Sequence, residues 1–262
     1  MKKGLFKLIM LGISFLGFSA SYAQEKCAVQ IIPQPQKVEQ TNGVYRLPEK
    51  IVIAFEASLK DQAEYLQEML AQSTGRVATL KEGKGKGDIV LSKDVELKSE
   101  AYRLSVNTKG IRIAASDASG AFYGIQTMRQ LFPAEIYNTR WQRNIVWEAP
   151  CIEIQDAPER PWRGLMMDVA RYFYDKDFIK KTIDMMAMYK LNKLQFHLID
   201  DSGWRLEIKK YPRLTEVGAW AGSDTRRLGG YYTQDDIREM IAYAKVRGVE
   251  LVPEIEFPAH IL

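Results

Sequence analysis

Ionisable side chains gather at the carboxyl ends of three apolar segments in the second half of the chain. Both histidines of the chain belong to this group, which consists of Asp168, Arg171, His197, Asp200, Asp201, Glu254, Glu256 and His260. Carboxylates and imidazoles exchange protons near neutral pH, and a guanidinium offers paired donors to oxygen atoms. Such a concentration is hard to explain by solubility. We therefore expect one site that combines proton transfer with substrate binding.

Each of these residues also has a structural interpretation. The acidic pair Asp200-Asp201 can cap a loop or the turn that follows it. His197 lies in an apolar segment and can be a satisfied core residue, and Arg171 can be a surface charge beside a helix. The interpretation as one site rests on the whole group and not on any single member.

A metal ion or a serine nucleophile would give these residues a different chemistry. The ligands of a zinc-like ion would be His197, Asp200, Glu254 and His260. No H-x-H or H-E-x-x-H spacing is present, so we expect no metal. A Ser-His-Asp triad is disfavoured because the chain has no G-x-S-x-G turn.

The segments around these residues alternate between strand and helix patterns. Strands are predicted at 163–169, 191–199 and 249–255, with helical spacing at 177–189 and a capping box, Thr233-x-x-Asp236, that opens a second helix. This order predicts a parallel sheet with right-handed crossovers. It fits the start of a (β/α)8 barrel or an open doubly wound sheet. Without a glycine-rich loop after the first strand, a nucleotide-binding sheet is less favoured.

A barrel places its chemistry at the carboxyl ends of its strands, which is where the ionisable group lies. A complete barrel takes about 250 residues, and residues 156–262 supply only its first three strands. We therefore expect the barrel to be incomplete in this chain, with its remaining strands beyond Leu262.

The link between Asp200 and Thr233 is unusually long. It has about 32 residues, where roughly 2–6 are usual in such units. Its aromatic residues are Trp204, Tyr211, Trp220, Tyr231 and Tyr232. Aromatic faces can stack on the apolar faces of sugar rings or simply pack together. The link is therefore a candidate wall of the site.

Residues 24–155 predict a separate small α+β domain. Strand patterns occur at 50–55 and 89–91, a hairpin is expected over 102–115, and helical spacing occurs at 59–70 and 121–131. No cluster of chemically active residues stands out there. The turn residues around Pro158 and Pro161 mark the boundary between this domain and the second one.

The first 23 residues resemble a secretory signal peptide. They contain three lysines, no acid, an apolar run from Leu8 to Phe18 and small residues before Ala23. The apolar run is too short for a membrane span, which needs about 20 residues. We expect export to the periplasm, cell surface or medium, with cleavage near Ala23. In that compartment Cys27 and Cys151 can either pair or remain separate thiols.

Composition excludes two further classes. The chain is 46% hydrophobic and 27% charged, which excludes a disordered protein. Its net charge of +4 comes largely from the three lysines at the N-terminus, so no basic surface for nucleic acid is expected.

Several ordered motifs resemble the β-N-acetylhexosaminidases of glycoside hydrolase family 20. In the second domain they are Arg163-Gly-Leu-Met-Met-Asp-Val-Ala-Arg171, His197-Leu-Ile-Asp-Asp-Ser-Gly-Trp-Arg205 and Pro253-Glu-Ile-Glu-Phe-Pro-Ala-His260. In the first domain they are Ile32-Pro-Gln-Pro35, Tyr102-Arg-Leu104 and Ala121-Phe-Tyr-Gly-Ile-Gln-Thr127. The resemblance covers nearly everything after the signal peptide. It implies a non-catalytic α/β domain followed by a catalytic TIM barrel.

The resemblance also implies a reaction. Family members remove terminal β-linked N-acetylglucosamine or N-acetylgalactosamine with retention of configuration and without a metal or organic cofactor. The acetamido oxygen of the substrate serves as nucleophile, which is an exception among retaining enzymes. Matched by position, Arg171 would bind sugar hydroxyls, and Asp200 and His260 would form a relay to the general acid.

The principal catalytic Asp-Glu pair of the family, usually within G-G-D-E, does not occur in this chain. We therefore expect the 262-residue chain to be inactive alone and the longer enzyme to act on glycans. A family member that binds sugar without cutting it, or an unrelated metal-dependent barrel hydrolase, would also fit the sequence.

Overall fold

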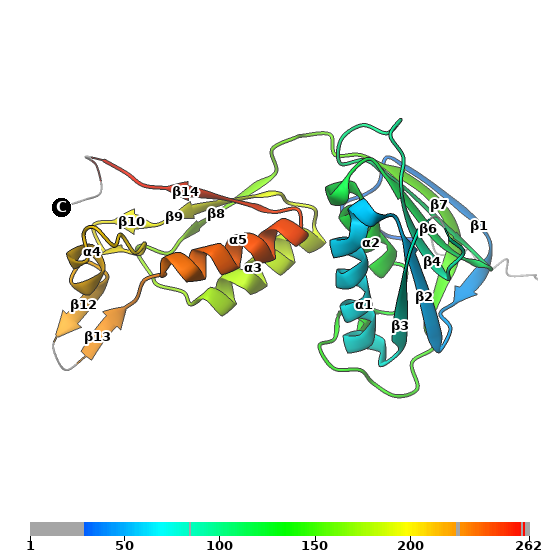
Figure 1. Ribbon diagram of the computed structural model, residues 1–262, viewed down its shortest axis with the longest axis horizontal. Coiled ribbons are helices and arrows are strands. Elements are labelled where there is room, and N and C mark those ends of the chain that lie inside the picture. The colour runs from blue at the N-terminus through cyan, green and yellow to red at the C-terminus, as the bar shows by residue number, and fades with distance from the viewer. Residues whose placement is uncertain (1–28, 84, 224–225, 258, 260–262) are drawn as a thin grey trace, which may run out of the picture.

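The structure is a computed structural model that describes residues 29–83, 85–223, 226–257 and 259. It contains two α/β units joined near residue 157, one built on a large mixed sheet and one on a small parallel sheet (Figure 1). The predicted signal peptide, Cys27 and His260 lie outside the described residues.

The first unit is a seven-stranded mixed sheet in the order β1-β7-β5-β6-β4-β2-β3. Strands β6, β4, β2 and β3 pair in parallel, whereas β1, β7 and β5 pair antiparallel, and β5 joins β6 as the predicted antiparallel hairpin. The strands are β1 (Lys37–Arg46), β2 (Lys50–Phe55), β3 (Val77–Glu82), β4 (Ile89–Lys93), β5 (Tyr102–Asn107), β6 (Gly110–Ala115) and β7 (Glu148–Asp156). The short 3-10 helices η1 (Ala57–Leu59) and η2 (Ala134–Tyr137) flank them.

Helices α1 (Lys60–Thr74) and α2 (Ala118–Arg129) lie between this sheet and the second unit (Figure 1). Every residue of α2 from Gly120 to Met128 is buried, as expected of a helix covered on all sides. A Cβ atom at Gly124 would lie 2.6 Å from Cγ2 of Ile113 on β6. Glycine at this position therefore allows α2 to approach the sheet closely.

The second unit confirms the alternation of strand and helix. Strands β8 (Gly164–Asp168), β9 (Lys193–His197) and β14 (Glu250–Glu254) form a parallel sheet in the order β14-β9-β8. Helices α3 (Lys176–Met188) and α5 (Gln234–Val246) cover one face of it (Figure 1). The predicted capping box of α5 is present, with the Thr233 and Asp236 side chains bonded to each other's backbone amides.

The long link between β9 and α5 contains several short elements. They are β10 (Ile199–Asp200), β11 (Gly203–Trp204), α4 (Arg213–Glu216), β12 (Trp220–Ser223) and β13 (Arg226–Gly229). The buried guanidinium of Arg205 fastens this link to the end of β8. It donates to the carbonyl oxygens of Val169, Ala170, Ala219 and Gly230 at 2.5–3.1 Å.

Two ion pairs join the units at the amino ends of β8 and β9. Arg163 Nη2 lies 3.0 Å from Glu100 Oε1, and Lys190 Nζ lies 2.8 Å from Asp156 Oδ2. The Lys190 side chain is only 6% exposed. Burial lowers the pKa of Lys190, and the charge of Asp156 opposes that effect. These contacts hold the base of the small sheet against the first unit.

Among the described residues, no helix has the length and apolar character that crossing a bilayer demands.

Candidate functional site

The register of the small sheet brings three predicted site residues to one level. Asp168 on β8 pairs with His197 on β9, and His197 pairs with Glu254 on β14. In-register residues of parallel strands share one face of the sheet. The three side chains therefore lie side by side at the carboxyl ends of their strands, as the sequence predicts.

The guanidinium of Arg171 lies between the carboxylates of Asp168 and Asp200. Its Nη1 lies 2.7 Å from Asp168 Oδ2, and its Nη2 lies 2.7 Å from Asp200 Oδ2. The other oxygen of Asp168 accepts the backbone N–H groups of Ala170 and Arg171, so the turn itself is fixed. The Arg171 side chain is nevertheless 54% exposed. A guanidinium anchored in this way can donate to an oxygen-rich ligand from outside.

Asp200 is the buried centre of the site, with its side chain 4% exposed. Its Oδ2 accepts from Arg171 and also lies 3.1 Å from His197 Nε2. Its Oδ1 accepts the backbone N–H of Asp201 at 2.8 Å. The side chain of Asp201 is exposed, so the two adjacent aspartates have different environments.

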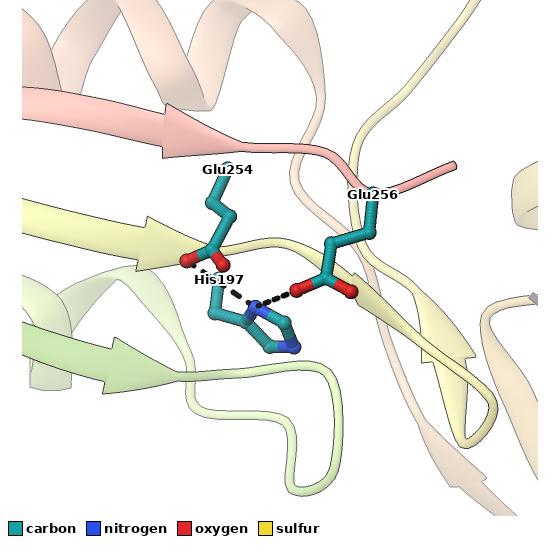
Figure 2. Close-up of side chains that lie close together, drawn as sticks. All are labelled: His197, Glu254 and Glu256. Carbon is teal, nitrogen blue, oxygen red and sulfur yellow. Dashed lines mark ion pairs between the residues drawn. The ribbon is translucent and has the colours of Figure 1, made fainter. Parts of the chain in front are cut away.

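His197 lies between carboxylates on both sides of its ring. Nδ1 faces Glu254 Oε2 at 3.4 Å and Glu256 Oε1 at 3.9 Å, as Figure 2 shows, while Nε2 faces Asp200. Burial alone would lower the pKa of His197, but the hydrogen bonds to Asp200 and Glu254 raise it above its ordinary 6.5. The hydrogen bond from Gln195 Nε2, at 2.6 Å, is the main reason that the pKa of Glu254 is lowered.

The side chains of His197, Glu254 and Glu256 are close enough for one metal ion, with candidate ligand atoms within 4.8 Å of one another. The ligand set considered from the sequence consisted of His197, Asp200, Glu254 and His260, and His260 lies outside the described residues. Asp200 and Glu254 do not face the same nitrogen of His197. Asp200 faces Nε2 and Glu254 faces Nδ1, and these two nitrogens point in different directions.

The structure brings together most of the predicted group. Asp168, Arg171, His197, Asp200, Glu254 and Glu256 converge, whereas His260 lies outside the described residues. Sequence reasoning missed Arg205 as the residue that holds the link in place. Its carbonyl partners lie 14 to 36 residues away along the chain, so no local pattern indicates this role.

Three aromatic residues of the link differ in how far they are exposed to solvent. Tyr232 is buried and packs against Phe173 and Phe196, so it belongs to the core. Trp204 donates its indole N–H to the carbonyl of Leu206 and is only partly exposed. Tyr211 is largely exposed. Packing therefore explains Tyr232, and Tyr211 remains a candidate for contact with a ligand.

Two family descriptions match the chain. Residues 28–157 match "Glycosyl hydrolase family 20, domain 2", and residues 161–262 match "Glycosyl hydrolase family 20, catalytic domain". A β-hexosaminidase of Porphyromonas gingivalis is 37% identical over 89% of the chain, and the N,N'-diacetylchitobiase of Vibrio harveyi is 35% identical over 91%.

A solved structure of Streptomyces plicatus N-acetyl-β-hexosaminidase superposes with a TM-score of 0.81. It is 36% identical, and the match covers 88% of this chain and 46% of that one. The chain spans 31% of the length of the P. gingivalis protein and 28% of the V. harveyi protein. Together, the matches to both domains and the agreement in fold show that the chain belongs to glycoside hydrolase family 20.

Proposed function

We propose that the protein containing this chain is an exo-acting β-N-acetylhexosaminidase. It removes terminal β-linked N-acetylglucosamine or N-acetylgalactosamine from glycans. The observation that carries the proposal is the anchored and solvent-facing guanidinium of Arg171, set between Asp168 and Asp200 at the strand ends. Relatives named β-hexosaminidase and N,N'-diacetylchitobiase support the same substrate class.

The proposed reaction is substrate-assisted and retains configuration. The 2-acetamido oxygen attacks the anomeric carbon as the bond to the leaving oxygen breaks, and a glutamic acid gives that oxygen a proton. Water then opens the oxazolinium ring from the face of the departed group. The Asp-Glu pair that performs these proton steps in the family is not in this chain.

The roles proposed for this chain's residues are binding and support. Arg171 donates to hydroxyl oxygens of the terminal sugar, where the geometry of its fork suits neighbouring acceptors. Asp200 and His260 form a relay in which the carboxylate orients the imidazole and the imidazole tunes the general acid. Residues 24–155 take no part in the chemistry.

We further propose that the small sheet is the beginning of a (β/α)8 barrel. The face opposite α3 and α5 carries three layers of in-register side chains, the middle one consisting of Met166, Gln195 and Val252. Met166 is 55% exposed, although such layers fill the interior of a closed barrel. The exposure of Met166 in this layer supports a sheet that closes with further strands.

Assays of the full-length protein with nitrophenyl N-acetyl-β-glucosaminide and galactosaminide test the activity. Proton NMR of the first sugar released should show the β anomer. An initial α anomer contradicts the proposed retention of configuration. Tight sugar binding without turnover contradicts the proposed activity and favours a sugar-binding protein. The 262-residue chain should show no turnover, which a parallel assay checks.

Export is the remaining proposal. Residues 1–23 direct secretion and are removed near Ala23. The mature protein should be recovered from the periplasm, surface or medium with a new N-terminus close to Gln24, as N-terminal sequencing reveals. Recovery from the cytoplasm with residues 1–23 intact contradicts this.

A further inference from the structure

We propose that His197 is a doubly protonated imidazolium at neutral pH and acts as a positioning residue for Asp200. Its part in the reaction rests on the proposed function, whereas its charge state does not. The imidazolium and Arg171 together supply two cationic donors to one oxygen of the buried aspartate.

The first argument is the hydrogen-bonding capacity of the ring. An ionised carboxylate only accepts hydrogen bonds, and a neutral imidazole donates from one nitrogen and accepts at the other. His197 has carboxylate oxygens in front of both nitrogens, Asp200 at Nε2 and the two glutamates at Nδ1 (Figure 2). In either neutral tautomer a lone pair would face a carboxylate. Only the imidazolium donates in both directions.

The second argument is the charge on the elements around the ring. Asp168 comes from β8, Asp200 from β10, Glu254 from β14 and Glu256 from the segment after it, while Arg171 is the neighbouring cation. The side chain of His197 is 6% exposed, so water screens these charges poorly. A proton on the ring adds a second cation beside Arg171 and so reduces the excess of negative charge from the four carboxylates.

A proton on Glu254 in place of the ring would also remove the conflict, but its surroundings oppose this. Glu254 Oε2 accepts from Gln195 Nε2 at 2.6 Å, and hydrogen bonds lower the pKa of Glu254. The same surroundings raise the pKa of His197. Both shifts favour the ion pair over two neutral partners.

The consequence is a fixed orientation for the Asp200 carboxylate. Arg171 Nη2 and His197 Nε2 both donate to Oδ2, and the backbone N–H of Asp201 donates to Oδ1. A neutral residue at position 197 would leave a weaker bond on one of these contacts. Asp200 could then turn, and the relay that depends on its angle would lose efficiency while Arg171 kept its second anchor at Asp168.

The charge state is tested by NMR of the full-length protein labelled with 15N-histidine. Signals of His197 are assigned as those lost in His197→Gln. At pH 7.5 both of its ring nitrogens should carry protons, so that the ring loses its second proton only at higher pH. A neutral tautomer at pH 7.5 overturns the proposal. Displacement of the Nδ1 proton by equimolar zinc also overturns it, in favour of a metal site.

The positioning role is tested by the kinetics of His197→Gln with nitrophenyl N-acetyl-β-glucosaminide. We expect kcat to fall about tenfold with KM within about threefold, and the alkaline fall of kcat to move. The control Arg238→Gln, on the exposed face of α5, should leave both constants unchanged. Equal kcat and pH profiles in His197→Gln and the unaltered enzyme overturn the positioning role. If the enzyme proves inactive, the NMR result still decides the charge state by itself.

Discussion

Arg171 and Asp200 form an ion pair of 2.7 Å between Nη2 and Oδ2, although they follow different strands of the sheet. Asp168 holds the other nitrogen of the same guanidinium at the same distance. The fork is therefore fixed before any ligand arrives. Hydroxyl groups of a sugar would meet donors whose direction is already set, which reduces the entropy lost on binding.

Arg171→Lys should lower kcat/KM about 100-fold in the full-length enzyme. Lysine keeps the positive charge but cannot contact Asp168, Asp200 and two sugar hydroxyls with one planar group. Steady-state kinetics with nitrophenyl N-acetyl-β-glucosaminide measures the effect. Arg238→Lys serves as the control and should retain full kcat/KM. A lysine variant with unchanged kcat/KM would falsify the binding role of Arg171.

Asp200→Asn should reduce kcat by about 100- to 1,000-fold, within the range of an acid–base contribution. The amide keeps the size of the side chain but removes the charge that Arg171 and His197 share. The neighbouring Asp201→Asn is the matched control, because the Asp201 side chain is exposed, and its kcat should change less than about threefold. Similar losses in both variants would count against a specific role for Asp200.

Lys190→Met should destabilise the junction between the two units. It leaves Asp156 without its buried ion partner, which typically costs roughly 3–5 kcal/mol. A lower midpoint in urea denaturation is the expected result. The double variant Lys190→Met/Asp156→Asn should recover part of the loss, and the exposed control Lys181→Met should show none. An unchanged midpoint in Lys190→Met would show that the pair does not stabilise the junction.

Stability in acid should depend on Asp236. The hydrogen bond from Lys176 is the main reason that the pKa of Asp236 falls from 3.8 to about 2. A lowered pKa in the folded state means that ionisation stabilises the fold. This contribution is complete above about pH 3.8 and is lost as the pH falls through about 2. Urea denaturation between pH 2 and 5 should show a shallower dependence in Asp236→Asn than in the control Asp235→Asn. Parallel curves for the two variants would exclude this contribution.

Strong periodicity made the second unit predictable. Apolar alternation and helical spacing located β8, β9, β14, α3 and α5 to within a few residues. Because parallel strands carry their chemistry at the carboxyl ends, the same pattern also predicts that Asp168, His197 and Glu254 lie together.

The elements that escaped prediction have weak patterns. The edge strand β1 is polar and almost wholly exposed, so it carries no apolar alternation. Strands β3 and β7 also lack a signal strong enough to separate them from loops. These strands form because neighbouring strands offer backbone hydrogen-bonding partners. The residues that supply these partners are distant in the sequence, so a local pattern does not indicate them.

The side-chain contacts within the site also could not be predicted from local sequence patterns. Local patterns indicate that Asp200 follows a strand, but they do not indicate that Arg171 and His197 donate to the same oxygen. Pairing of this kind depends on register and loop path, which are properties of the folded chain.

The hydrogen bonds from Arg205 to four carbonyl oxygens have a consequence for which ligands the site accepts. Because one side chain ties the insertion between β9 and α5 to the end of β8, the boundary on that side of the site is built during folding. For the glycan substrates proposed above, a boundary fixed in this way predicts that selection depends on the shape of the saccharide more than on the closing of a flap.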